Sequence, residues 1–180
     1  MPKVKGIIFD PLPRRENHVK LAERSLMHPA PTRGYYFEDF QVGQTIKTAG
    51  RTVTEGDIMT FAGLTGDNNQ IHTDAEFSKG TQFGERVAHG LLGLSITSGL
   101  AWRTGILEGT VMAFREVGDW KFVKPVLIGD TIHADMTVTE TKALPRIGGG
   151  SVAIHFDVKN QSNETVMRGR WLVLILSRPT

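Results

Sequence analysis

One polar segment near the middle of the chain gathers side chains that could carry acid and base chemistry. Residues 66–74 read Gly-Asp-Asn-Asn-Gln-Ile-His-Thr-Asp, which places two carboxylates, one imidazole and several amides within a short stretch. An aspartate or histidine alone would more often be a turn, cap or surface residue. Together, Asp67 and His72 could hold one water molecule and move its protons, because imidazole exchanges protons near neutral pH and burial can tune a carboxylate.

A second imidazole stands where an apolar stretch begins. His89 and Gly90 close the segment Val87-Ala-His-Gly, and apolar residues at helical spacing follow it as far as Trp102. The first N–H groups of a helix lack partners within the helix, so Gly90 would offer a free donor beside the polar segment. A base, an acid and a donor for a carbonyl oxygen are the parts needed to hydrate a double bond conjugated to a thioester.

The elements that must position these groups follow from the hydrophobic pattern. Thr54 and Asp57 form a capping-box start for a helix that stops at the glycines of residues 63–66, and residues 75–78 read as a short helical turn. The long buried helix is expected over residues 88–102. Strands are expected at 44–54, 111–126, 131–138, 152–158 and 165–176. This order predicts an α+β fold in which an antiparallel sheet wraps a long central helix, with an exposed sheet edge that favours a dimer.

Composition excludes several classes of protein. Among 180 residues, 21 Lys and Arg face 19 Asp and Glu, and a net charge of +2 gives no indication of a nucleic-acid partner. There is no cysteine, which excludes disulfides, thiolate metal sites and cysteine nucleophiles. The longest apolar run, residues 171–176, is far shorter than the roughly 20 residues a membrane helix needs. With no secretion signal evident, we expect a soluble cytoplasmic protein.

The chain is expected to hold one folded domain, because its length falls in the usual range for one. Five of the eight prolines fall in the charged first part of the chain, residues 1–34, which we interpret as an N-terminal extension. From residue 35 the regular alternation of strands and turns begins and continues to residue 180. The predicted domain is therefore 35–180.

Three ordered motifs resemble those of the MaoC-like family of (R)-specific enoyl-CoA hydratases and dehydratases. The central one is Gly66-Asp67-x-Asn69-x-Ile71-His72-x-Asp74, followed by Phe83-Gly84 and Val87-Ala88-His89-Gly90-x-Leu92. Phe37-Glu38-Asp39-Phe40-x-Val42-Gly43 precedes it, and Phe122-x-x-Pro125-Val126-x-x-Gly129-Asp130 comes later. The resemblance spans nearly all of residues 35–176.

The resemblance implies a hot-dog fold, a homodimer or a higher assembly of dimers, and reversible hydration of trans-2-enoyl thioesters to (R)-3-hydroxyacyl thioesters. The carrier would be coenzyme A or acyl carrier protein, and no cofactor or metal is implied. By position, Asp67 and His72 become the catalytic pair, and Asn69, His89, Gly90 and Ser95 become candidate oxyanion or substrate-binding residues. Gln70 departs from the pattern, because the family generally has proline there, and this puts the loop geometry in doubt.

Other functions remain open from the sequence. A metal site could use His72, Asp74 and His89, although no ligand spacing supports it. A hot-dog thioesterase would direct water to the carbonyl carbon instead of the β-carbon. A non-catalytic subunit that binds acyl thioesters is the third alternative. Ser95 could make room for an acyl chain or simply allow its helix to pack closely. The length and branching of the acyl chain are not determined.

Overall fold

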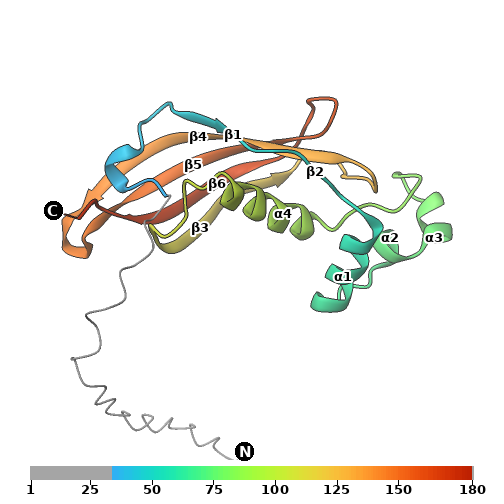
Figure 1. The fold of residues 1–180 in the computed structure, drawn as a ribbon. Helices are drawn as coiled ribbons and strands as arrows, with labels where there is room; N and C mark the ends of the chain where they lie inside the picture. The colour runs from blue at the N-terminus through green and yellow to red at the C-terminus, as the bar shows by residue number, and fades with distance from the viewer. Residues whose placement is uncertain (1–33, 180) are drawn as a thin grey trace, which may run out of the picture. The chain divides into compact units, whose positions relative to one another are not determined.

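One long helix lies against the concave side of a curved antiparallel sheet in the computed structural model, which describes residues 34–179 (Figure 1). The helix is α4 (Gly90–Arg103). The remaining elements are η2 (Phe37–Asp39), β1 (Thr45–Lys47), β2 (Arg51–Thr52), α1 (Glu55–Thr65), α2 (Gln70–Thr73), α3 (Ala75–Lys79), β3 (Val111–Phe122), β4 (Thr131–Leu144), η3 (Pro145–Ile147), β5 (Gly149–Lys159) and β6 (Thr165–Leu176).

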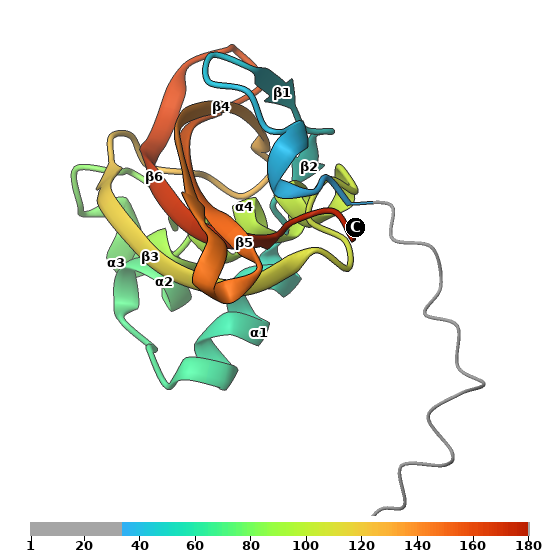
Figure 2. The same ribbon diagram turned by 90° about the vertical axis from the view of Figure 1, so that its left-hand side faces the viewer.

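The sheet runs in the order β1-β4-β5-β6-β3, and β2 also pairs with β4. Every described pairing is antiparallel. Figure 2 shows how the sheet curls around α4, while α1, α2 and α3 lie outside the curl near one end of that helix. The expected α+β arrangement is confirmed.

Alternation along the strands explains which face is buried. In β4, Ile132, Ala134, Met136 and Val138 are at most 2% exposed, whereas the residues between them are partly exposed. Side chains alternate across a strand, so one face of β4 points at the helix. The apolar face of α4, which includes Leu92, Ile96 and Leu100, joins the same core cluster. Burial of this apolar surface is the main force holding helix and sheet together.

Two expected elements differ in the structure. The strand expected over residues 44–54 is split into β1 and β2. At the break, the buried side chain of Thr48 accepts a hydrogen bond from the Ala134 N–H at 2.9 Å, taking over the role of a strand carbonyl. The strand expected to reach residue 126 stops at Phe122, and residues beyond it line a pocket.

The segment expected to be a polar loop, residues 67–74, contains the helical turn α2. Asn69 caps this turn, because its side chain accepts a hydrogen bond from the Ile71 N–H at 3.2 Å. The start of α1 is confirmed, since Thr54 and Asp57 form the reciprocal capping box. The N-terminal extension, apart from Gly34, lies outside the described residues. No helix within residues 34–179 is long and apolar enough to cross a membrane.

Candidate active site

A sharp turn after α1 brings the polar segment to the front of α4. Gly66 ends α1 in the left-handed conformation, with φ of 77°, which glycine adopts without steric cost. Two short helices follow, each capped by a side chain: Asn69 caps α2 and Asp74 caps α3. The buried hydroxyl of Ser78 lies 3.3 Å and 3.2 Å from the carbonyl oxygens of Gln70 and Ile71. These contacts fix the backbone on both sides of His72.

The His72 ring is buried and held in one tautomer. It is 8% exposed, and its Nδ1 lies 2.7 Å from the carbonyl oxygen of Val87. A carbonyl oxygen can only accept a hydrogen bond, so Nδ1 must carry the proton. In the neutral ring, Nε2 is then the nitrogen with a free lone pair. The geometry therefore leaves His72 able to accept a proton at Nε2.

His89 connects the polar segment, His72 and the start of α4. Its Nε2 donates a hydrogen bond to the carbonyl oxygen of Asp67 at 2.9 Å. Its ring stacks on His72 with centroids 3.8 Å apart, and Phe61 packs on it at 5.1 Å. His89 is only 3% exposed and is also the N-cap residue of α4. These contacts hold Asp67 and His72 beside the N-terminus of the long helix.

The first turn of α4 offers free backbone donors. Among the hydrogen bonds of residues 34–179, none uses the N–H of Gly90, Leu91 or Leu92. The strand-like segment before the helix is pinned on both sides, because Val87 N–H donates to Ile71 and Ala88 N–H donates to Val126. The Gly90 N–H is therefore a fixed, unused donor close to the two imidazoles, which is the arrangement needed to hold a developing negative charge.

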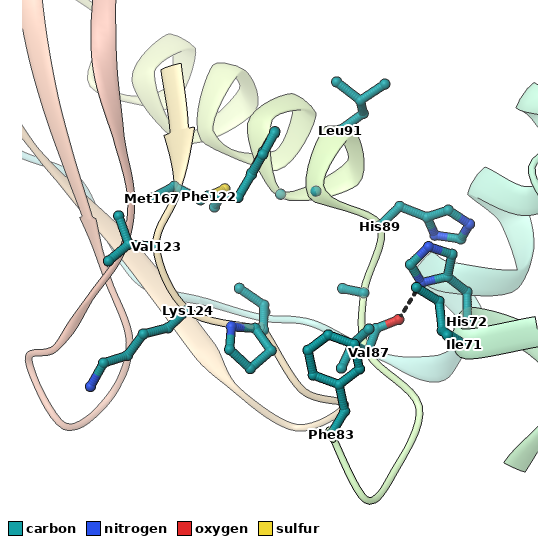
Figure 3. A pocket seen from close by; sticks show the side chains of 15 residues that line it. Ile71, His72, Phe83, Val87, His89, Leu91, Phe122, Val123, Lys124 and Met167 are labelled. Atoms are coloured by element: carbon teal, nitrogen blue, oxygen red, sulfur yellow. Dashed lines mark hydrogen bonds between the residues drawn. The ribbon is translucent and has the colours of Figure 1, made fainter. Parts of the chain in front are cut away.

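A pocket of about 430 Å³ opens at this point (Figure 3). The stacked rings of His72 and His89 lie at one side of it, and Phe122, Val123 and Lys124 lie across from them. Apart from the two histidines, the buried residues of its lining carry no polar side-chain group, and they are Val87, Ala88, Gly93, Val126 and Met167. The site thus joins proton-accepting groups to an apolar recess, which suits a ligand with a reactive polar end and an apolar tail.

Three candidate residues, Asp67, Asn69 and Ser95, do not line this pocket, and Asp67 is exposed beside it. The side chain of Asn69 is used as the cap of α2. Ser95 is exposed, and its hydroxyl donates to the carbonyl oxygen of Leu91 at 2.8 Å. Substrate contact by either residue stays a prediction. Three basic residues of the described chain form ion pairs with acidic partners: Arg51 with Asp57, Arg86 with Glu55, and Lys124 with Glu164.

The metal-ligand set differs from the one that the sequence suggested. Asp74 caps α3 through the Phe77 N–H, whereas Asp67, His72 and His89 place one ligand atom each within 4.8 Å of one another. The two imidazole planes are only 28° apart and stacked. Ring lone pairs lie in the ring plane, so stacked rings do not direct them at one point, as a tetrahedral ion requires. The geometry suits a proton-transfer pair better than a metal centre.

No pattern in the sequence indicates that Met167 lines the pocket. Strand alternation indicates that Met167 is buried, but it does not say which element faces it. Phe83 and Phe122 stand in motifs quoted above, although no role followed from their positions. Which residues form the pocket depends on how α4 lies on the sheet, and short-range patterns carry no information about that contact.

Comparison with known sequences identifies the family. The profile described as "MaoC like domain" matches residues 39–159. An (R)-specific enoyl-CoA hydratase of Rhodospirillum rubrum is 37% identical over 105 residues, covering 58% of this chain and 70% of that protein. Protein MaoC of Klebsiella aerogenes is 39% identical over 102 residues, covering 57% of this chain and only 30% of that protein.

Solved structures agree with the sequence matches. A protein of Archaeoglobus fulgidus described as a monoamine oxidase regulatory protein has a TM-score of 0.75 and 42% identity, covering 81% of this chain and 97% of that one. A Mycobacterium tuberculosis protein with a double hot-dog fold has a TM-score of 0.71 at 18% identity, covering 82% of this chain and 46% of that one, a likeness of fold alone. The fold is therefore the hot-dog fold, and the chain belongs to the MaoC-like dehydratase family.

Proposed function

We propose that the protein catalyses the reversible hydration of trans-2-enoyl thioesters to (R)-3-hydroxyacyl thioesters. One observation carries the proposal: His72, with its free Nε2, and Gly90, with its unused N–H, line the same apolar pocket, and the Asp67 carboxylate lies within 4.8 Å of the imidazole nitrogens beside it. The similarity to the (R)-specific hydratase of Rhodospirillum rubrum supports the same reaction.

In this proposal each group has one task. The water oxygen bonds to the β-carbon as one of its protons moves to Nε2 of His72. The Asp67 carboxylate accepts a hydrogen bond from the same water and stabilises the imidazolium that forms. The electron pair of the double bond moves toward the thioester, where the Gly90 N–H holds the charge on the carbonyl oxygen. The proton then passes from His72 to the α-carbon, so that one water is added in total and both groups return to their starting state.

The thioester carrier and the assembly are further parts of the proposal. Coenzyme A is the preferred carrier because the relative from Rhodospirillum rubrum is named for it, and acyl carrier protein is the alternative. A homodimer would cover β3, which ends the sheet and exposes large apolar residues such as Phe114 and Val117. An uncovered, apolar edge strand is a ready surface for pairing with a second copy.

The direct test follows the loss of enoyl absorbance when crotonyl-CoA or a longer trans-2-enoyl-CoA is mixed with the protein. We expect wild type to hydrate at least one of them, and Asp67→Asn and His72→Gln each to lower kcat by about 10²- to 10⁴-fold. His155→Gln is the matched control, because that histidine lies outside the pocket, next to Asp157. It should keep the wild-type rate.

Two other outcomes would contradict the proposal. Release of free coenzyme A without loss of the double bond would indicate a thioesterase on the same fold. Binding of the thioester with no turnover, and with no effect of either substitution, would indicate a non-catalytic binding subunit. Chiral analysis of the 3-hydroxyacyl product tests the (R) configuration separately.

A further inference from the structure

We infer that the acyl chain of the substrate ends against Met167, and that the contact between Gly93 and Met167 sets the longest chain the pocket accepts. This inference rests on the proposed function and adds the substrate class to it: thioesters with an unsubstituted apolar acyl chain of limited length. Both residues line the pocket and both are buried, Met167 being 1% exposed.

The buried part of the pocket suits an acyl chain and not the arm of the carrier. Val87, Ala88, Val126 and Met167 are between 1% and 9% exposed, and none carries a polar side-chain group. The pantetheine arm of coenzyme A has two amides, which would lose their hydrogen bonds to water in such surroundings at a cost in free energy. An alkyl chain has no hydrogen bonds to water to lose there, and its burial among apolar side chains is favourable. His72 is hydrogen-bonded to the Val87 carbonyl oxygen and His89 follows Ala88, so the reacting end of the pocket borders this wall, whereas Lys124 lies across the pocket.

The arm of the carrier is expected to extend from the pocket into solvent past its exposed lining residues. Leu91, Phe122 and Val123 also line the pocket and are 60%, 52% and 47% exposed. In Figure 3 the amine of Lys124 points away from the cavity, and it pairs with Glu164 at 2.6 Å. The lining therefore includes exposed as well as buried residues, with His72 in the wall. A thioester carbonyl at Gly90 would direct its acyl chain toward Gly93, one helical turn further along α4.

Gly93 and Met167 lie close enough together to limit the length of the acyl chain jointly. A Cβ atom at Gly93 would lie 2.7 Å from Cε and 2.9 Å from Sδ of Met167, so only glycine leaves room for the methionine end. Methionine is unbranched and flexible, and it fills irregular gaps in apolar surroundings. Truncating it should therefore deepen the pocket, whereas a methyl group at residue 93 should push the methionine end into it.

The test measures kcat/KM for trans-2 crotonyl-, hexenoyl-, octenoyl- and decenoyl-CoA. Met167→Ala should raise the ratio of decenoyl to crotonyl by about tenfold or more, since a few methylene groups in a pocket change selectivity by at least that factor. Gly93→Ala should lower the same ratio by about tenfold. Met136→Ala is the matched control, because Met136 is equally buried at 1% exposure but lies in the core and not in the pocket.

The outcomes distinguish a failure of the proposed acyl-chain boundary from a failure of the proposed hydratase function. An active wild type whose chain-length ratio is the same in Met167→Ala and Gly93→Ala would overturn the acyl boundary and leave the hydratase proposal standing. A wild type that hydrates none of the four thioesters would overturn both. Because truncating a buried methionine can destabilise the chain, circular dichroism is recorded for each variant; Gly93→Ala adds a good helix former and gives the decisive result if Met167→Ala does not fold.

Discussion

The two stacked imidazoles differ in which nitrogen is left free, and this difference separates their roles. His72 donates through Nδ1 to Val87 and keeps Nε2 available, whereas His89 donates through Nε2 to Asp67. The Nδ1 of His89 is buried and has no hydrogen-bond partner among residues 34–179. His89 therefore positions both the Asp67 backbone and the His72 ring, and the proposed proton transfer belongs to His72.

Gly90→Ala should remove most of the activity while leaving the chain folded. The added Cβ would lie 2.9 Å from two carbons of the Phe122 ring, so that ring must move and the pocket beside the proposed oxyanion donor changes. Loss of one such donor costs about 10²- to 10³-fold in kcat, and a disturbed donor should approach that loss. Gly99→Ala on the same helix is the control, because nothing lies within 4 Å of its Cβ. Wild-type kcat in Gly90→Ala would remove this residue from the site.

Gln70→Pro should stabilise the chain without changing kcat. Gln70 is the first residue of α2, its N–H makes none of the described hydrogen bonds, and Asn69 before it has φ −54° and ψ 135°. Proline fits the first helical position and the extended residue before it. We expect the free energy of unfolding in urea to rise by about 0.4–1 kcal/mol. Ile71→Pro should lower it instead, because the Ile71 N–H donates to the Asn69 side chain.

At the scale of elements, three helices with side-chain caps, α1, α2 and α3, lead the chain to the candidate active site. Thr54, Asn69 and Asp74 each accept a hydrogen bond from a backbone N–H at the start of α1, α2 or α3. A cap of this kind contributes about 0.5–2 kcal/mol. The successive caps hold the chain between α1 and α4 in a single path, which explains how an exposed segment can position a buried histidine.

The capping box of α1 should weaken in acid. Partial burial alone would raise the pKa of Asp57. Hydrogen bonds from Thr54 and the charge of Arg51 lower the pKa by more than burial raises it, so the pKa lies below its usual value. Stabilisation by a carboxyl with a lowered pKa is present above the unfolded pKa, near about 4, and is lost as the pH falls through the folded pKa. We expect Asp57→Asn to lower the free energy of unfolding by about 1 kcal/mol at pH 7 and by much less near pH 3.

Urea unfolding of wild type and Asp57→Asn at both pH values measures this difference. Asp135→Asn is a useful second variant, because a hydrogen bond from Lys159 is the main cause that lowers the pKa of Asp135 as well. If Asp57→Asn lowers the free energy of unfolding by the same amount at pH 7 and pH 3, the carboxylate charge does not stabilise the cap.

At the scale of the whole molecule, the described residues leave a band of apolar side chains uncovered. β3 exposes Met112, Phe114 and Val117 at 39%, 49% and 41%, and α4 exposes Trp102 at 55%. Large apolar side chains exposed together usually mark an interaction site. The end position of β3 in the sheet is consistent with the proposed pairing of two copies.

Val117→Lys should convert the proposed dimer into a monomer. A lysine on an edge strand places a charge in the new interface and discourages strand pairing. Thr45→Lys is the matched control, because Thr45 lies on β1 at the other edge of the sheet and is exposed. Light scattering after size-exclusion chromatography gives the mass in each case. A monomeric wild type, or a dimer that survives Val117→Lys and is lost in Thr45→Lys, would place the interface elsewhere.

Local patterns in the sequence were sufficient for most elements. Period-two alternation in residues 131–138 and 152–158 predicted β4 and β5, and helical spacing after Gly90 predicted α4, because each element must present one apolar face to the core. Thr54 and Asp57 predicted the start of α1 through a contact within one turn. The break at Thr48 was missed, since it depends on a hydrogen bond to Ala134 on another strand.

The sequence also determined which residues are proposed to carry the chemistry, because Asp67, His72 and Gly90 stand in ordered motifs. Only the tertiary structure decided the tautomer of His72, the stacking of His89 upon it, and the meeting of Gly93 with Met167. Each of these depends on atoms that are distant along the chain and close in space. Patterning reports which face of an element is buried, but the packing of helix on sheet decides what that face touches.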